Sequence, residues 1–262
     1  MPELPPLHNA VIYNKKKDIV KELIGTSTVD DINTALHLAI MNNNLDLYDV
    51  LIDTADINAK DEDGNTPLHL ALIHITDDYI PYNLIKEGAD KEAMDKNDKT
   101  PLHIAVENKK SSMVGALISH LANKEARDKQ GRTPLHIAAD LDNIDIAERL
   151  INKGANKEAK DINGQTPLHI AVKYNNIQMA KYLIRKGANK ETADSDCKTP
   201  IHLAFENNFH DMTNSLTNIS CGSAAGGKQT MKRRSKKSKK NKKKSTKKRH
   251  STRKTRKRRQ KR

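Results

Sequence analysis

The sequence predicts an all-α solenoid, a linear stack of helix–turn–helix units, followed by a disordered basic tail. Three observations support this prediction. A short motif recurs at a nearly constant spacing, two helical patterns follow most copies, and the last 35 residues differ sharply in composition from the rest. A fixed period of about 33 residues is typical of stacked arrays rather than of one globular core.

The repeated motif is a Thr followed by Pro-Leu-His or a close variant, and its Thr residues are separated by 32, 34, 33, 33 and 33 positions. The copies begin at Thr34, Thr66, Thr100, Thr133, Thr166 and Thr199. A degenerate copy, PPLHNA, begins at Pro5, so we count seven units. Because a catalytic site is built once, a motif present in every unit indicates architecture rather than chemistry.

The motif has the properties of a helix start. In GQTPLHIAVKY, Thr166 is a suitable N-cap, since its hydroxyl can accept from free amides of the first turn. Pro167 then occupies N1, where its missing N–H costs nothing. His169 falls at N3, from which its ring can reach back toward the cap as Glu does in a capping box. The Thr-His pair therefore predicts a capped helix.

A second helix follows in each unit and ends in a turn. MAKYLIRKG and IAERLINKG place paired apolar residues one helical turn apart, and Leu-Ile follows the motif Thr by 17 residues in most units. Gly154 and Gly187 lie where a C′ glycine would end the helix. ANKEAKDINGQ then places Asp and Gly for a tight turn. Each unit thus reads helix, turn, helix and an extended hairpin-like loop.

These motifs resemble the ankyrin repeat over residues 5–219, with TPLHxA, LIxxGA and DxxGxTPLH each present several times. The departures are specific. A Lys-Glu pair replaces the usual apolar-polar pair in GADKEA, LANKEA and GANKEA. Asp98 and Cys197 replace the turn glycine in two units, while the unit from Thr66 has one extra residue and Pro81 near its second helix. A local irregularity is therefore expected in that unit.

Charge divides the chain into two parts. Residues 228–262 hold 22 of the 47 Lys and Arg residues and no acid, so the remainder has 25 basic against 33 acidic residues. The overall charge of +14 thus combines a body of −8 with a tail of +22. We predict a repeat domain over residues 1–219, a small-residue linker over 220–228 and a disordered Lys/Arg-rich tail over 229–262.

Several patterns are absent from the sequence. It has no phosphate-binding glycine loop, nucleophile elbow or metal-ligand spacing, and seven of its 11 His occupy the repeated slot. We therefore expect no enzyme activity, no cofactor and no metal. No apolar run approaches the roughly 20 residues of a spanning helix, and MPELPPLHNA does not read as a signal peptide. Two cysteines suit a reducing, intracellular compartment.

The resemblance implies a protein-interaction scaffold that grips its partner with turn tips and the exposed side of the first helices. Position by position, this selects Lys129, Gln130, Arg132, Ile162, Asn163 and Gln165 on the loops, and Asp140, Leu141, Lys173 and Tyr174 on the helices. Tyr174 and Leu141 are bulky residues expected to face outward; the alternative is packing between units. For the polar loop residues, the alternative is solvated turn chemistry.

The tail supports a second hypothesis, non-specific nucleic-acid binding or nuclear and nucleolar targeting. The residues concerned are Lys232, Arg233, Arg234, Lys236, Lys237, Lys239, Lys240, Lys242, Lys243 and Lys244. Because no aromatic residue interrupts the tail, binding would be electrostatic and blind to sequence. Membrane adhesion ranks lower, since no apolar anchor accompanies the charges. The remaining alternatives are a solubilising tail and a tail that masks acidic residues such as Glu62 and Asp63. We expect a monomer.

Overall fold

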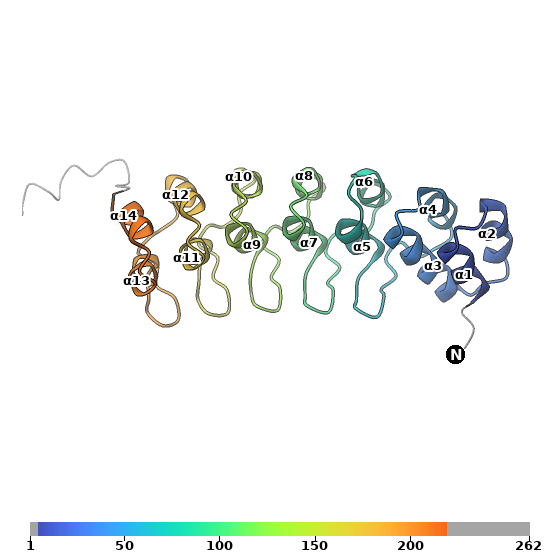
Figure 1. Ribbon diagram of the computed structural model, residues 1–262, viewed down its shortest axis with the longest axis horizontal. Helices are drawn as coiled ribbons and strands as arrows, with labels where there is room; N and C mark the ends of the chain where they lie inside the picture. Colours follow the sequence, from blue (N-terminus) through green and yellow to red (C-terminus); the bar gives the residue numbers. More distant parts are fainter. Residues whose placement is uncertain (1–4, 219–262) are drawn as a thin grey trace, which may run out of the picture. The chain divides into compact units, whose positions relative to one another are not determined.

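The computed structural model describes residues 5–218, which form fourteen α-helices and no strand (Figure 1). The helices are α1 (Pro6–Ile12), α2 (Lys17–Ile24), α3 (Val29–Met41), α4 (Leu45–Leu51), α5 (Pro67–His74), α6 (Tyr79–Lys86), α7 (Pro101–Glu107), α8 (Ser111–Ser119), α9 (Pro134–Asp140), α10 (Ile144–Asn152), α11 (Pro167–Lys173), α12 (Ile177–Arg185), α13 (Pro200–Glu206) and α14 (His210–Asn218). Consecutive odd and even helices make seven pairs, here called units one to seven. The predicted all-α repeat architecture is confirmed.

The units stack in sequence order and form two helical layers (Figure 1). Each odd-numbered helix contacts the odd-numbered helices of the neighbouring units as well as its own partner, while most even-numbered helices contact the next even one. The core lies between the layers, where Leu68, Leu102, Leu135 and Leu168 of successive first helices are fully buried. Because each unit buries its apolar face only against neighbours, stability depends on the interfaces between units.

The motif starts helices as predicted in five units. Thr133 forms a capping box in which its side chain accepts from the N3 backbone amide, and its own backbone N–H donates to Nδ1 of His136 at 3.1 Å. Pro134 occupies the first helical position. The same arrangement recurs at Thr66, Thr100, Thr166 and Thr199. This confirms the structural interpretation of the Thr-His pair.

Extending that interpretation to Thr34 is wrong. Helix α3 begins at Val29, and its capping box is formed by Thr28 and Asp31. Ala35 stands where the other motifs have Pro, so the helix continues toward the N-terminus for a further turn and more. Thr34 consequently lies inside α3, and its hydroxyl donates to the carbonyl of Asp30 at 2.9 Å.

The irregularity predicted for the third unit is present. Elsewhere the turn between the paired helices contains one residue with positive φ, for example Lys109 at 55° and Asn175 at 58°. The connection from α5 to α6 has no such residue, and Ile75 is extended with φ −94° and ψ 130°. Pro81 lies in the first turn of α6, where helix amides lack partners, so it does not break the helix. The inserted residue therefore changes this turn alone.

The predicted C′ glycines end the second helices. Gly154 and Gly187 have φ values of 86° and 90°, which only glycine adopts without a steric penalty. Beyond each glycine the chain leaves the helical layers and runs through a protruding hairpin loop to the next unit (Figure 1). These loops position the candidate site.

Candidate protein-binding surface

Each hairpin loop is closed by one aspartate. Oδ1 of Asp128 accepts from the backbone amides of Gln130 at 2.9 Å and Arg132 at 2.8 Å. The same double contact is made by Asp61, Asp95, Asp161 and Asp194 in their own loops. A carboxylate that accepts two backbone amides fixes the turn and points the intervening side chains away from the array. The tips are therefore rigid display positions.

The turn residue after each tip has a left-handed backbone. Gly131 has φ 70°, and a Cβ at this position would lie 2.9 Å from the backbone nitrogen of Ile162 in the next loop. Asp98 and Cys197, the two non-glycine residues at this position, adopt φ values of 58° and 60°. The turn geometry thus survives both departures from glycine, at the conformational cost that a side chain carries there.

Neighbouring tips are joined through the main chain. The amide of Lys129 donates to the carbonyl of Asn97 at 3.0 Å, and that of Ile162 donates to Gln130 at 3.1 Å. The amide of Ser195 continues the series to Asn163 at 3.0 Å. Since these bonds use only backbone atoms, the side chains of Lys129, Gln130, Ile162 and Asn163 stay exposed. Four predicted contact residues therefore form a continuous outer edge.

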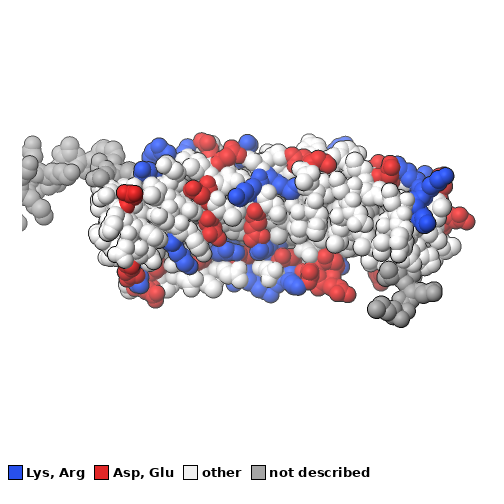
Figure 2. Space-filling model, in the orientation of Figure 1, with Lys and Arg blue, Asp and Glu red and all other residues white. Residues whose placement is uncertain are grey.

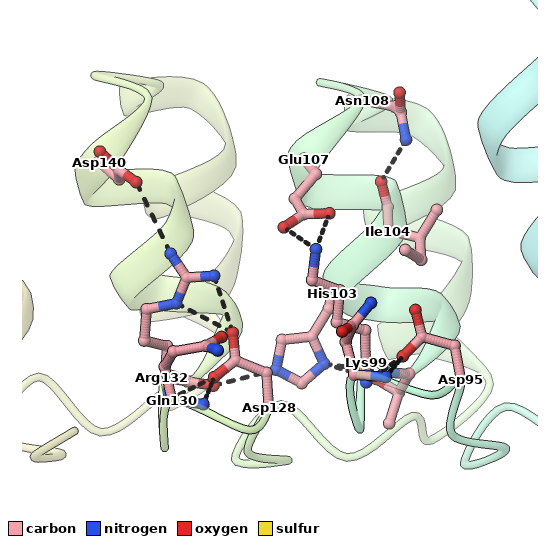
Figure 3. Close-up of polar contacts among 12 residues, drawn as sticks. Asp95, Lys99, His103, Ile104, Glu107, Asn108, Asp128, Gln130, Arg132 and Asp140 are labelled. Carbon is pink, nitrogen blue, oxygen red and sulfur yellow. Dashed lines mark hydrogen bonds and ion pairs between the residues drawn. The ribbon is translucent and has the colours of Figure 1, made fainter. Parts of the chain in front are cut away.

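The motif histidines connect one unit to the next. Nε2 of His136 donates to the carbonyl of Gln165 at 3.0 Å. Nε2 of His103 donates to the carbonyl of Arg132 at 3.1 Å (Figure 3). Because Nδ1 already accepts from the Thr amide, the proton must lie on Nε2 and the ring is neutral. Burial lowers the pKa of both histidines, which agrees with this assignment. These histidines are structural.

This connection between units was not predicted from the sequence, which suggested only the cap. The sequence gives little indication of this hydrogen bond, because its acceptor is a backbone carbonyl 29 residues away that any residue can supply. The carbonyls of Arg132 and Gln165 are therefore committed to the fold. Their half-buried side chains are what remains for a partner.

Arg132 and Asp140 are held by each other and by the loop. Arg132 donates to Oδ2 of Asp128 through Nε at 2.9 Å, and its Nη1 lies 3.8 Å from Oδ2 of Asp140 (Figure 3). The preceding unit has the equivalent pair, in which Nζ of Lys99 lies 2.7 Å from Glu107. The charges of Arg132, Asp140, Lys99 and Glu107 are already compensated within the fold. Each of these side chains would have to break an existing contact to bind a partner.

The two bulky first-helix residues differ. Tyr174 is 52% exposed, and the ammonium of Lys173 lies 5.6 Å from the centroid of its ring. Leu141 is half-buried and packs against the core. Tyr174 is therefore exposed as expected, whereas Leu141 is not fully exposed.

The Lys-Glu pairs of the loop arms also join units. Oε1 of Glu125 accepts from the amide of Asn156 at 2.9 Å, and Glu92 and Glu158 make the same contact with Asn123 and Asn189. A carboxylate thus satisfies a main-chain donor of the next unit. The sequence marked the Lys-Glu pair as a departure from the family, and the structure gives its glutamate a role in stacking.

The surface divides into exposed and restrained residues. The exposed members are Lys129, Gln130, Ile162, Asn163, Lys173 and Tyr174, and the half-buried members are Arg132, Asp140, Leu141 and Gln165. We call the exposed six the contact surface. Within residues 5–218, no group of His, Cys, Asp or Glu side chains is arranged to hold a metal ion. In the same range no helix is long and apolar enough to cross a membrane.

The predicted basic residues, Lys232 to Lys244, lie outside the described part of the chain. So do the linker and tail assigned to residues 220–262. These assignments stay predictions.

The helix pairs stack on one another, and backbone hydrogen bonds join their successive hairpin loops. This arrangement defines a helical repeat protein whose exposed side chains lie at the loop tips and at the ends of the first helices. A family model for ankyrin repeats (3 copies) matches residues 7–80, 77–161 and 158–224. Because these matches cover most of the chain, it belongs to the ankyrin repeat family. Ankyrin repeats are a protein–protein interaction module, and proteins built from them are generally non-enzymatic. A search of curated proteins found no match.

Proposed function

We propose that this chain is an interaction scaffold that binds a partner protein through the contact surface. The observation that carries the proposal is the main-chain bonding between successive tips, which fixes the backbone that carries the exposed tip side chains before binding. A pre-organised surface loses little conformational entropy on association. Rigid tips that display varied side chains are what a recognition surface requires.

The contact surface combines apolar anchors with cations. Ile162 is 66% exposed although isoleucine is usually buried, and the large aromatic ring of Tyr174 is 52% exposed. Lys129 at the neighbouring tip and Lys173 beside the tyrosine add positive charge. Such a surface fits a partner that offers an apolar patch bordered by carboxylates, with Ile162 and Tyr174 as the residues of largest binding energy.

Affinity capture from lysate tests this proposal. The bait is the full chain, and we compare the wild type with the Ile162→Asp, Tyr174→Ala double variant. A matched control carries Lys153→Ala and Arg185→Ala, two exposed residues at the ends of second helices. A discrete protein should be captured by the wild type and the control and lost by the double variant. Equal capture by all three baits would exclude the contact surface as the binding site.

The tail supports a second proposed activity, electrostatic binding of nucleic acid together with a nuclear location. The supporting observation is compositional: residues 228–262 hold 22 cationic residues and no acid. Each neutralised phosphate releases counterions, so binding should weaken steeply with salt. We further propose that the chain is monomeric and has no catalytic activity.

Salt titration of DNA binding by the full chain tests the tail proposal. A variant with Gln at the ten basic positions from Lys232 to Lys244 serves as comparison. The wild type should show a linear decrease of log affinity with log salt, and the variant a shallower slope. Equal slopes would remove the tail as the binding element, and cytoplasmic retention of the fluorescently tagged wild type would contradict the nuclear location.

A further inference from the structure

A groove opens in the second unit between α3 and the arm of the following hairpin loop. Its volume is about 800 Å³. Asn33, His37, Leu38 and Met41 line it from the helix, and Asp56 and residues 59–63 line it from the arm. This groove lies apart from the contact surface of residues 129–174, on a different unit of the stack.

The groove is strongly acidic. Five carboxylates contribute to its lining, those of Asp30, Asp56, Asp61, Glu62 and Asp63. Lys60 is the single lysine or arginine in the lining, and its ammonium is bound to the carbonyl of Met94 at 2.8 Å. Figure 2 shows an acidic patch at the loop before α5, beside basic side chains at the loops that follow.

Several of these charges have no counter-ion in the fold. Asp63 pairs with Lys96 of the next loop. Among residues 5–218, no cation lies at ion-pair distance from Asp30, Asp56 or Glu62. The groove therefore presents uncompensated negative charge to whatever enters it.

His37 adds an unused acceptor. Its side chain is nine-tenths buried and lines the groove, and Nε2 contacts the carbonyl of Ala59 at 3.1 Å. In units three to seven Nδ1 takes the Thr amide, but Thr34 lies inside α3, so Nδ1 of His37 has no partner among the described residues. The one fully buried, unpartnered side-chain polar atom in that range is the hydroxyl of Tyr182, so Nδ1 of His37 is not fully buried.

An apolar strip runs beside the groove. Met41 lines the groove and is 46% exposed, and the equivalent residues of the adjoining helices, Ile12 on α1 and Ile73 on α5, are 42% and 38% exposed. Helices α1, α3 and α5 pack against one another in this order, so the three side chains follow one line. In units four to seven the same position is charged.

We propose that this groove binds an arginine-containing, partly apolar segment of a partner protein. Guanidinium groups match carboxylates in bidentate geometry and supply donors to an acceptor such as His37 Nδ1. Apolar residues of the same segment cover Met41, Ile73 and Ile12. The chain's own tail matches the charge, but residues 228–262 contain no Ile, Leu, Val or Phe to cover the strip, so a separate partner fits better. The inference rests on the proposed scaffold function and names a second partner chemistry.

Fluorescence anisotropy with labelled 12-residue peptides and the full chain tests the inference. The probe alternates Arg with Leu, and the control peptides replace Arg by Glu or Leu by Ser. The Arg-Leu peptide should bind most tightly, with an affinity that falls as salt rises. Equal binding of the Glu-Leu peptide would overturn the inference, because charge complementarity carries it.

Matched variants locate the binding. Asp56→Asn with Glu62→Gln keeps the oxygen that accepts from Asn58 and removes two charges. We expect about a tenfold weaker peptide affinity, equivalent to about 1.4 kcal/mol. Glu191→Gln with Asp196→Asn removes two exposed charges from the last loop and should leave affinity nearly unchanged. An equal loss in both variants would show a general charge effect and overturn the site.

Two further measurements separate this inference from the proposed function and from the tail. The Ile162→Asp, Tyr174→Ala variant should bind the peptide as the wild type does; peptide binding that fails while lysate capture persists overturns the groove alone. Gln substitution of the tail lysines and arginines should leave peptide affinity unchanged. A gain in affinity would show that the tail occupies the groove, which contradicts the commitment to a separate partner.

Discussion

Seven residues after the start of each motif, units one to three carry Ile12, Met41 and Ile73, whereas units four to seven carry Glu107, Asp140, Lys173 and Glu206. The backbone position is the same, and the chemistry changes halfway along the stack. In units four, five and seven a cation at the loop base pairs with the acid at this position. In units two and three the loop base carries Asn33 or Asn65, and the apolar residue stays exposed.

The difference shows how one repeat supports two kinds of surface. Where Lys99 reaches Glu107, the face is internally compensated and the loop tips carry the exposed chemistry. Where no such pair forms, the groove retains free carboxylates beside an apolar strip. At the histidines the change falls one unit earlier, since His37 of unit two has one hydrogen bond, whereas His69 of unit three and His136 of unit five have contacts through both ring nitrogens. The following predictions test this division, from the largest expected effect to the smallest.

Acidification should give the largest effect. Burial lowers the pKa of His37, His69, His103, His136 and His169 in the folded chain. Below about pH 6.5 the unfolded chain binds protons that the folded chain does not, so stability falls as pH drops toward the folded pKa values. The melting temperature should therefore be lower at pH 5 than at pH 7.5. An unchanged or higher value at pH 5 would contradict the neutral, buried assignment.

Removing the motif histidine should cost more in unit five than in unit two. His136→Ala removes contacts at both ring nitrogens and leaves a cavity, so we expect a loss of about 2–4 kcal/mol in the free energy of unfolding. His37→Ala removes one contact and should cost about 1–2 kcal/mol. Urea denaturation followed by circular dichroism measures both. Equal losses would contradict the difference in hydrogen bonding between His37 and His136.

Removing the motif threonine sharpens the same comparison. Thr133→Ala deletes an N-cap and should cost about 1 kcal/mol, whereas Thr34→Ala changes an exposed helix-interior residue and should have almost no effect. Thr28→Ala is the matched control, since Thr28 caps α3. Thermal denaturation distinguishes the three. A loss at Thr34 as large as at Thr133 would contradict the early start of α3.

The loop-base ion pairs should contribute least. Lys99→Gln removes the ion pair with Glu107, in which both side chains are half-buried. We expect a loss of about 0.5–1 kcal/mol in the free energy of unfolding. The loss should shrink at high salt because the pair is partly screened. Asn65→Gln, at the equivalent position of unit three, has no ion pair to lose and serves as control. A loss larger than that at His136 would reverse the proposed order of contributions.

Much of the fold was predictable because it depends on short-range chemistry. The motif spacing, the Thr-Pro-x-His helix start and the C′ glycines each act within one turn of the chain, so each has a local sequence pattern. The error at Thr34 has the same origin. Ala35 replaces the motif Pro and leaves the motif recognisable, but without the Pro the helix can begin earlier in the chain, at Val29. The exposed tip residues were also predictable, since turn geometry determines which side chains protrude.

By itself the sequence determined the repeat, its helix starts and turns, and the residues displayed at the tips. The tertiary structure alone decided which of those residues remain free. Arg132 is restrained because Asp128 and Asp140 both reach it, and Leu141 is half-buried because it packs against the hydrophobic core. The acidic groove likewise exists because α3 and residues 56–63 come together. Such contacts depend on distances between residues far apart in the chain, so no local pattern reports them.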